Sequence, residues 1–482
     1  MKRAISLAVI ALLAAGTASA ADLLSVYQDA LANDPTIRQA DALRKATKER
    51  KPQAWAALLP QITGQGTYTR GMTDNTRSTP QGLTDPITNL PTGAYVIVPT
   101  NQVSHPKSTV WSINLSQNLF SWTNWATLQA ADSEVAQAEA DYRTAQQGLL
   151  SRVAQRYFAV LAAQDSLEAQ QVALEAFNRQ LDQANKRFEV GLIAITDVQD
   201  SKAARDQTNA AVIEAKRSLA SAEEQLREVT GQKYDRLSRP GAQMALASPA
   251  PADEQEWVNM ALDQNTQLLS SRLASDIARE NVRVAFGGHL PTVNLVGTYG
   301  KNKDNGAATI LGAGTFDPYP SNGTTKTYGL QVQVPIFSGG LTQSRVRESE
   351  FRWIAAKEAT TASSRATERA ARDAYLGVIS EMARVEALKQ AVESSETSLK
   401  ATEAGYEVGT RTSVDVLDQR RQLVANQTTY LNSRYVYLTN VVALRQAAGI
   451  LDEKTLQELN ALLTESVSAA PTAPNSPNTP AR

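Results

Sequence analysis

The stretch that decides the fold is GYEVGTRTSVDVLD at residues 405–418, because its pattern also occurs as RFEVGLIAITDVQD at residues 187–200. Both copies contain Glu-Val-Gly followed by two aspartates three positions apart. Further pairs extend the match, since LP at residues 59–60 and GTY at residues 66–68 recur at residues 290–291 and 297–299. A period of roughly 220 residues is too long for a solenoid repeat. The chain is therefore predicted to contain two tandem copies of one structural half.

Long helices are predicted on both sides of the repeated stretch. Residues 107–239 contain no Pro and only three Gly, and residues 336–470 contain no Pro. Apolar residues at heptad spacing before each copy are typical of a coiled coil. Gly191 and Gly409 follow these stripes and suit hairpin turns. We therefore expect two antiparallel helices in each half, and residues 341–405 alone would span about 100 Å at 1.5 Å per residue.

Four short segments alternate between apolar and polar residues instead. They are residues 62–68, 111–119, 293–299 and 328–336, with the first pattern the weakest. Strict alternation over about ten residues is typical of transmembrane β-strands, although a small soluble sheet is the alternative. Four strands cannot close a barrel, because the smallest single-chain barrels have about eight. Several copies must then share one barrel, and three copies would supply 12 strands; four copies stay possible on sequence alone.

The predicted fold class is thus an all-α periplasmic coiled-coil tunnel plus a transmembrane β-barrel, with four strands per chain in a trimer. Residues 69–108 and 300–326, rich in Gly, Pro, Thr and Asn, are expected to be outer surface loops, with the helices on the opposite side. The predicted divisions are a signal peptide (1–20), a first repeat (21–231), a linker (232–251), a second repeat (252–449), a C-terminal helix (450–465) and a disordered tail (466–482).

The N-terminus is predicted to be a cleaved secretory signal. Lys2 and Arg3 precede an apolar run at residues 5–15, and Ala18-Ser19-Ala20 supplies small residues for the cleavage site. The apolar run is shorter than the roughly 20 residues that span a bilayer, which disfavours a membrane anchor.

Composition excludes several classes of function. The 482 residues include 48 Lys and Arg, 49 Asp and Glu, two His and no Cys. A net charge near zero gives no basis for nucleic-acid binding. Without Cys there can be no disulfide framework, thiolate metal site or N-terminal lipid anchor on Cys. No catalytic residue, metal site or cofactor is predicted, because no set of acid, base and nucleophile converges.

These motifs resemble the outer-membrane efflux family, in particular its trimeric channels without a lipid anchor. The resemblance extends over residues 21–463 and is carried by residues 187–198 and 405–418, with support from GHLPT at residues 288–292 and VPIFSGG at residues 334–340. The last motif is shared by the wider family. The resemblance implies a homotrimeric exit duct in the outer membrane, with helices in the periplasm. Implied partners are outer-membrane lipid, a periplasmic adaptor, and an inner-membrane drug pump or ABC transporter of type I secretion.

A gate is expected where the two hairpins diverge. The first repeat has Phe188 and Ile193 where the second has Tyr406 and Arg411, so two apolar positions have become hydrogen-bond donors. The resemblance implies that Tyr406 and Arg411 bond to Asp197 and Thr196 and hold the channel closed. By the same resemblance, Glu403 and Gln180 form a second latch pair.

Two further sites follow from the same turns. Asp415 and Asp418 share one helix face. The resemblance places them at the narrowest part of the lumen, where six carboxylates would raise and couple their pKa values and favour cations. The resemblance also implies that the turns meet an adaptor, through Gly191, Leu192, Gly409 and Thr410.

Two other classes of protein fit the sequence less well. A purely structural periplasmic adaptor would leave the four alternating segments without a purpose. An outer-membrane enzyme would need a catalytic set that the sequence does not supply.

Overall fold

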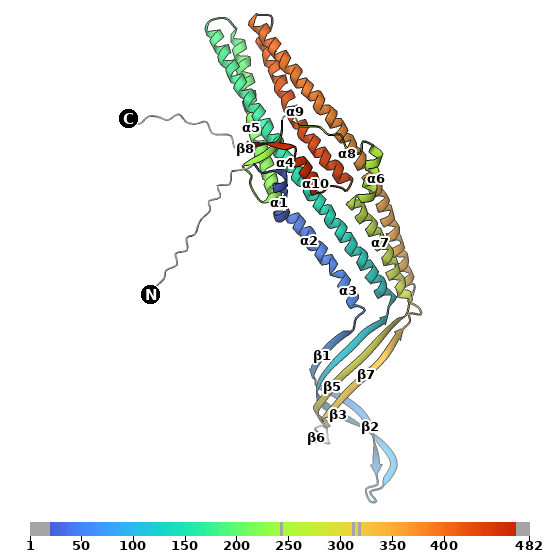
Figure 1. The fold of residues 1–482 in the computed structure, drawn as a ribbon. Coiled ribbons are helices and arrows are strands. Elements are labelled where there is room, and N and C mark those ends of the chain that lie inside the picture. Colours follow the sequence, from blue (N-terminus) through green and yellow to red (C-terminus); the bar gives the residue numbers. More distant parts are fainter. Residues whose placement is uncertain (1–19, 242–243, 311–313, 317–319, 469–482) are drawn as a thin grey trace, which may run out of the picture. The chain divides into compact units, whose positions relative to one another are not determined.

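The computed structural model describes residues 20–241, 244–310, 314–316 and 320–468 (Figure 1). The chain divides into two compact units. The first unit combines Met1–Ala46, Ala136–Leu273 and Lys357–Arg482, and the second combines Thr47–Val135 and Ala274–Ala356. Each unit takes segments from both predicted repeats, so the compact units are not the repeats. The predicted signal peptide lies outside the described residues, except for Ala20.

The second unit contains an antiparallel sheet in the order β1–β3–β5–β7. Its long strands are β1 (Gln61–Arg70), β3 (Pro91–Phe120), β5 (Thr292–Ile310) and β7 (Ser321–Gln333), with β2 (Thr73–Thr84) paired to β3 and β6 (Gly314–Phe316) paired to β5. The register places Ile113 opposite Tyr299 and Leu295 opposite Leu330. All four predicted strand segments are confirmed, except that the last ends at Gln333, two residues before Pro335, which has no N–H to donate.

The prediction that residues 69–108 and 300–326 form loops is wrong. Residues 73–84 pair with residues 91–104 as β2 and β3, β5 continues to Ile310, and β7 begins at Ser321. The runs are rich in Thr as well as Gly and Pro, and this β-branched residue suits a pleated ribbon. Several Gly and Pro residues, such as Pro80, Pro99 and Gly306, therefore lie within strands and not in turns.

Helices flank the sheet in the sequence. The second unit contains α3 (Arg50–Ala56), η1 (Gly287–His289), the end of α7 (Thr266–Phe286) and the first residues of α4 (Trp122–Glu189) and α8 (Leu341–Glu407). The ring of Trp55 lies edge-on to Trp125, with centroids 6.4 Å apart, and joins α3 to α4. Strands and long helices thus follow one another with connections of only a few residues.

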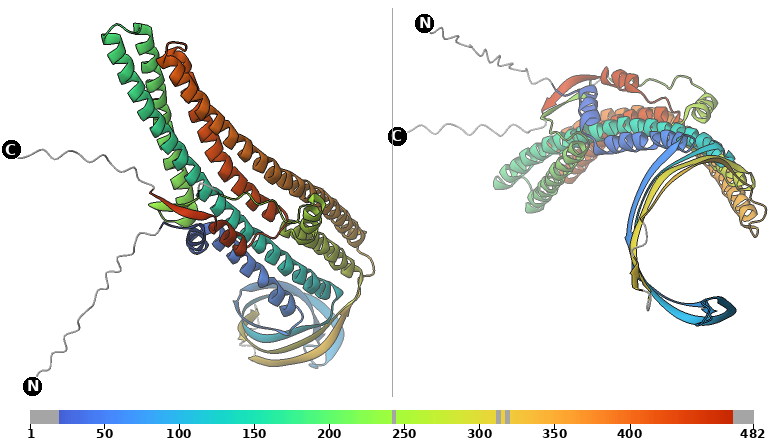
Figure 2. Two further views of the ribbon diagram at one scale, coloured as in Figure 1. Left: turned by 45° about the horizontal axis from the view of Figure 1, so that its top comes forward. Right: turned by 90° about the horizontal axis from the view of Figure 1, so that it is seen from below.

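The first unit is built on four long helices. They are α4, α5 (Ile195–Thr230), α8 and α9 (Ser413–Ala447), accompanied by α1 (Leu23–Asn33), α2 (Pro35–Lys48), α6 (Glu254–Gln264) and α10 (Glu453–Asn460). The predicted long helices and their hairpin turns are confirmed (Figures 1 and 2). Large side chains fill one core between α4, α5 and α9, namely Leu149, Tyr157, Phe158, Leu161, Leu226 and Leu438.

A buried polar pair joins α4 to α9 within this core. The Tyr435 hydroxyl donates a hydrogen bond of 2.6 Å to Asp165 Oδ2. Burial raises the pKa of Asp165, against the opposing effects of this bond and of the nearby guanidinium of Arg239. Because a buried carboxyl needs such partners, the pair fixes one relative position of the first and second hairpins.

Two of the predicted divisions contain a strand that the sequence pattern does not indicate. The predicted linker 232–251 contains β4 (Arg236–Pro240), and the helix predicted at residues 450–465 ends at Asn460, as α10. Residues 463–468 form β8 (Leu463–Ser468), which pairs with β4. Leu237 is fully buried, and the Tyr157 hydroxyl donates to the Ser238 carbonyl at 2.6 Å, so tertiary contacts stabilise this sheet. The rest of the predicted disordered tail, residues 469–482, lies outside the described residues.

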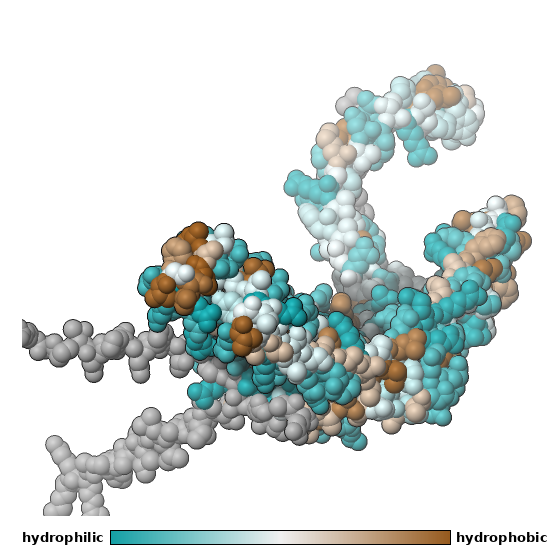
Figure 3. Space-filling view, turned by 90° about the horizontal axis from the view of Figure 1, so that it is seen from above, coloured by the Kyte–Doolittle hydropathy of each residue, from teal (hydrophilic) through white to brown (hydrophobic). Residues whose placement is uncertain are grey.

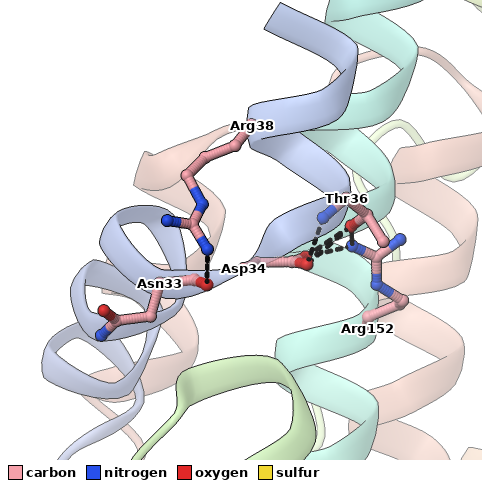
Figure 4. Close-up of polar contacts among 5 residues, drawn as sticks. All are labelled: Asn33, Asp34, Thr36, Arg38 and Arg152. Carbon is pink, nitrogen blue, oxygen red and sulfur yellow. Dashed lines mark hydrogen bonds and ion pairs between the residues drawn. The ribbon is translucent and has the colours of Figure 1, made fainter. Parts of the chain in front are cut away.

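A buried carboxylate fastens the junction of α1 and α2 to α4 (Figure 4). Asp34 accepts hydrogen bonds from the Thr36 backbone N–H at 2.8 Å, the Thr36 hydroxyl and the Arg152 guanidinium. Burial by itself would raise the pKa of Asp34, but the bonds from Thr36 and Arg152 outweigh it and lower the pKa. Arg38, by contrast, donates to the exposed Asn33 carbonyl.

We predict that Arg152→Met loosens this junction, because it removes the cation that faces a buried carboxylate. We expect the free energy of local opening to fall by about 1 kcal/mol or more, with the partial exposure of Arg152 limiting the loss. This loss corresponds to roughly fivefold to tenfold faster amide exchange in α1 and α2. Hydrogen–deuterium exchange in detergent measures this. Arg38→Met is the matched control and should change exchange less than twofold. Since the pKa of Asp34 is lowered, the contribution is present above about pH 4 and is lost as pH falls through the lowered value. Equal effects of the two variants would contradict the assignment.

Candidate functional site

The two hairpin turns of the first unit have the same backbone geometry. Gly191 has φ +73° and its N–H donates to the Phe188 carbonyl at 2.9 Å, whereas Gly409 has φ +78° and donates to the Tyr406 carbonyl at 3.1 Å. Both lie in the left-handed region, which favours glycine. The turns predicted from the repeated Glu-Val-Gly pattern are therefore confirmed.

Different side chains surround these turns. The tip of the first hairpin exposes Val190, Leu192 and Ile195, and hydrophobic residues gather there in Figure 3. The second tip exposes Val408 but carries Thr410 and Arg411 at the next positions. One tip is thus mainly apolar and the other mixed, although their backbones match.

The helices that leave the turns also begin differently. Thr412 is the N-cap of α9, and its hydroxyl accepts from the Asp415 N–H while Asp415 Oδ2 accepts from the Thr412 N–H at 2.9 Å. This reciprocal arrangement is a capping box. Ala194 occupies the corresponding position before α5 and makes no side-chain bond. The first turn of α9 therefore has a local stabilisation that α5 lacks.

Two contacts join the first hairpin to the second near the turns. Ser413 Oγ donates a hydrogen bond of 2.6 Å to Asp197 Oδ1, and the Ser413 side chain is buried. The Arg187 guanidinium lies over the Tyr406 ring, 4.9 Å from its centroid. Each contact pairs a residue of α4 or α5 with one of α8 or α9.

The sequence prediction missed Ser413 and Arg187. A signal for Ser413 was available, because it replaces the apolar Ile195 of the first repeat, the same kind of change that identified Tyr406 and Arg411. Arg187 likewise stands where the second repeat has Gly405. Only the structure shows that these two residues face the other hairpin.

In the single chain, the residues of the first predicted latch have partners other than those predicted. Among the described residues, no hydrogen bond links Tyr406 or Arg411 to Asp197 or Thr196, and Thr196 is exposed. Arg411 uses its backbone N–H, which donates to the Gly405 carbonyl at 3.2 Å. The structure thus brings Asp197 and Tyr406 to the contact between hairpins, through partners other than those predicted.

The second predicted pair is also separated in its contacts. Glu403 accepts a charge-assisted hydrogen bond from Arg420, which joins α8 to α9 within one hairpin. Gln180 lies buried on α4. No bond between Glu403 and Gln180 occurs in the described part of the chain.

Asp415 and Asp418 each have a local partner. The bonds from Thr412, first of all from its backbone N–H, lower the pKa of Asp415. Asp418 Oδ1 accepts from Arg421 Nη1 at 2.9 Å while its side chain stays exposed. Within one chain the pKa of Asp415 therefore shifts opposite to the direction predicted for six crowded carboxylates. Asp200, at the position equivalent to Asp418, is exposed on α5.

Two features are absent from the described residues. No helix there is both long and apolar enough to cross a membrane. No group of three or more His, Cys, Asp or Glu side chains suited to holding a metal ion occurs in the same residues.

Paired long-helix hairpins, each preceded by strands of one antiparallel sheet, define the class of outer-membrane channels. The family model for the outer membrane efflux protein matches residues 26–232 and 257–450, so the chain belongs to this family. The family consists of channel proteins of the outer membrane, not enzymes. The resemblance inferred from the two turn motifs is confirmed.

Among particular relatives, the chain is 36% identical to outer membrane protein TolC of Vibrio cholerae over 468 residues, covering 96% of this chain and 98% of that one. It is 34% identical to TolC of Escherichia coli K12, with 94% and 87% covered. It is 27% identical to the alkaline protease secretion protein AprF of Pseudomonas aeruginosa, with 91% and 87% covered.

Solved structures share the fold. The outer membrane protein VceC of Vibrio cholerae superposes with a TM-score of 0.69 at 20% identity, covering 89% of this chain and 96% of that one. The CmeC outer membrane channel of Campylobacter jejuni gives 0.69 at 18% identity, with 92% and 90% covered.

We predict that Thr412→Ala frays the start of α9, because it removes the capping box. A loss of about 1 kcal/mol should speed amide exchange in the first turn about fivefold. Ala194→Ser is the reciprocal variant and should slow exchange at the start of α5, since it supplies the missing acceptor. If both variants leave exchange unchanged at their helix starts, the difference between the hairpins does not arise from capping.

Proposed function

We propose that the chain is the passive exit duct of multidrug efflux pumps and of type I protein secretion, working as a homotrimer in the outer membrane. Three chains would each contribute four strands to a 12-stranded barrel, and the helices would form a tunnel in the periplasm. The cleaved signal peptide would provide export. No energy source is needed in the duct, because the inner-membrane drug pump or ABC transporter would supply it.

The observation that carries this proposal is the unclosed sheet. In the described strands, β1 pairs only with β3, and β7 pairs only with β5, so both outer edges are free. The sheet also exposes an apolar row that includes Ile113, Leu330 and Val332. The apolar face suits lipid, whereas the free edges are incompatible with lipid unless other copies pair with them. Sharing a barrel among copies satisfies both requirements.

The relatives support the two export roles. Their names connect them with outer membrane efflux and, for AprF, with secretion of an alkaline protease. A duct used by different pumps needs no substrate-binding site of its own. We therefore assign selection of the cargo to the pump.

The gate is proposed to be an iris at the helical hairpin tips. Asp197 with Ser413 and Arg187 with Tyr406 hold the two hairpins of one chain together. Arg411, Thr196, Glu403 and Gln180 surround the same region and complete the proposed latch in the trimer. Such contacts are weak enough to be broken when a partner binds one state more tightly.

The adaptor is proposed to bind the tips. Gly191 and Gly409 create the turns, and Leu192 and Thr410 follow them in exposed positions. Exposed apolar residues at the first tip suit a helical hairpin of a periplasmic adaptor. Docking there would separate the hairpins and open the iris.

Paired substitutions test the duct and its latch together. Purified wild-type protein should form channels in planar bilayers, and Tyr406→Phe with Arg411→Ser should raise the single-channel conductance at least severalfold, because the closed tips are released. Arg179→Ser, which removes an exposed arginine of α4, is the control and should leave conductance unchanged. Absence of any channel contradicts the duct, whereas channels with unaltered conductance contradict only the latch.

The carboxylate ring has its own test. Asp418→Asn should reduce cation selectivity, measured as a shift of the reversal potential toward zero in a salt gradient, because it removes three charges from the trimer. Asp418 is the informative position, since Asp415 also caps α9 and its loss would distort the helix start. Asp206→Asn on α5 is the control. Equal reversal potentials for Asp418→Asn and wild type would place the selectivity elsewhere.

A further inference from the structure

A long two-stranded ribbon extends from one end of the sheet. This end is formed by the strand residues that lie farthest along the chain from the helices. We call residues 73–101 the outer ribbon; it consists of β2, the turn at residues 85–90 and the first part of β3. Pairing between β3 and β5 begins at Gln102, which lies opposite Ile310. Among the described residues, the part of β3 before Gln102 pairs with β2 alone. Isolated two-stranded ribbons are marginally stable in water, so this one calls for a packing partner.

The turn at the end of the ribbon is rigid. Asp85 Oδ1 accepts from the Ile87 N–H at 2.8 Å and from the Thr88 N–H at 3.2 Å, and the Asp85 N–H donates to the Leu90 carbonyl at 2.9 Å. These bonds, all made within residues 85–90, hold the backbone of the turn.

This fixed turn displays apolar side chains. Ile87 is 92% exposed, Leu90 64% and Leu83 45%, and we call these three residues the tip cluster. Hydrophobic atoms gather at the far end of the curved sheet in Figure 3. A rigid turn that presents three apolar residues has the features of a contact surface, because little entropy is lost when it docks.

Membrane lipid does not explain the tip cluster. Leu90 lies 21 residues before Trp111 on β3, about 70 Å of strand at 3.3 Å per residue, whereas the hydrocarbon core is about 30 Å thick. Between them, Asn101, His105 and Lys107 interrupt the apolar side of the strand. The ribbon itself contains one cationic residue, Arg77, and two anionic residues, Asp74 and Asp85. Its net negative charge is a poor complement to anionic lipid headgroups.

The curvature of the second unit indicates the partner. The outer ribbon continues the curl of the sheet toward its concave side (Figure 2). If three such sheets close into one barrel, every tip turns toward the enclosed axis. Twelve strands about 4.8 Å apart and tilted by about 40° give a ring radius of about 12 Å. The 12 residues from Leu90 to Gln102 extend about 40 Å, which is more than enough to reach the axis.

We propose that the tip clusters of three copies pack against one another on the threefold axis and cap the outer mouth of the duct. The proposal rests on the proposed trimer. It adds a second constriction, at the end opposite to the iris, formed by Leu83, Ile87 and Leu90. The three apolar tips supply each other with the packing partner that the ribbon lacks.

The absence of Cys from the chain provides a clean test, because a single introduced Cys can form a disulfide only with another copy. Ile87→Cys and Leu90→Cys probe the tip, and Asn75→Cys, opposite Gln102 at the base of the ribbon, is the matched control. A disulfide requires Cα atoms within about 7 Å. Detergent-solubilised protein would be oxidised at several dilutions and separated by denaturing electrophoresis, while native mass spectrometry reports the trimer independently.

The expected result is a crosslinked dimer from both tip variants, independent of dilution and containing at most two thirds of the chains, since one of three cysteines stays unpaired. Asn75→Cys should give only a trace. A trimer in which the tip variants crosslink no more than Asn75→Cys would overturn the cap and leave the proposed duct intact. Crosslinking that falls with dilution would show collision between assemblies and would also overturn it. Loss of the trimer in wild-type protein would refute the proposed function itself.

Discussion

The free edges of β1 and β7 are the constraint on which the rest of the architecture depends. An unpaired strand edge exposes N–H and C=O groups, and in lipid each such group costs several kcal/mol. In the described residues of one chain, β1 pairs only with β3 and β7 only with β5, so each leaves one edge unpaired. Assembly is therefore a condition for membrane insertion in the proposed duct. The helices follow the strands with short connections, so the symmetry that closes the sheet would also arrange the hairpins around one axis.

The two repeats use one backbone plan with different side chains. Their turns share the left-handed glycine, yet the first tip is apolar and uncapped while the second is capped by Thr412 and Asp415. If the two hairpins had identical side chains, they would pack in the same way, and neither would be preferred to move. The divergence at positions such as Ile195 and Ser413 instead creates a donor on one hairpin for an acceptor on the other. Local differences between the two hairpins thus provide contacts that the proposed gate can use.

Sequence patterns predicted the elements with a strong period and missed those that tertiary contacts decide. The long helices and the four strand segments follow from heptad spacing and from alternation. The outer ribbon was mistaken for a loop, because Gly and Pro in residues 69–108 outweighed the β-branched residues between them. The β4–β8 pair depends on Leu237 and on the Tyr157 hydroxyl, which lie far apart in sequence. At the hairpin tips, charge and spacing identified Asp197 and Tyr406, but their partners depend on side-chain directions that the sequence does not specify.

The contacts between hairpins have a strength suited to a gate. A side-chain hydrogen bond such as that between Ser413 and Asp197 contributes about 1 kcal/mol, and an arginine over a tyrosine ring about as much. Two contacts in each of three chains then sum to about 6 kcal/mol. Moving an equilibrium from 1:99 to 99:1 takes about 5.5 kcal/mol of differential binding. In the proposed iris these contacts would make the closed state stable by default, and three docked adaptor hairpins would need to contribute about 3 kcal/mol each to bring the open state to 99%. Much stronger ion pairs at these positions would keep the proposed duct closed even with its partners bound.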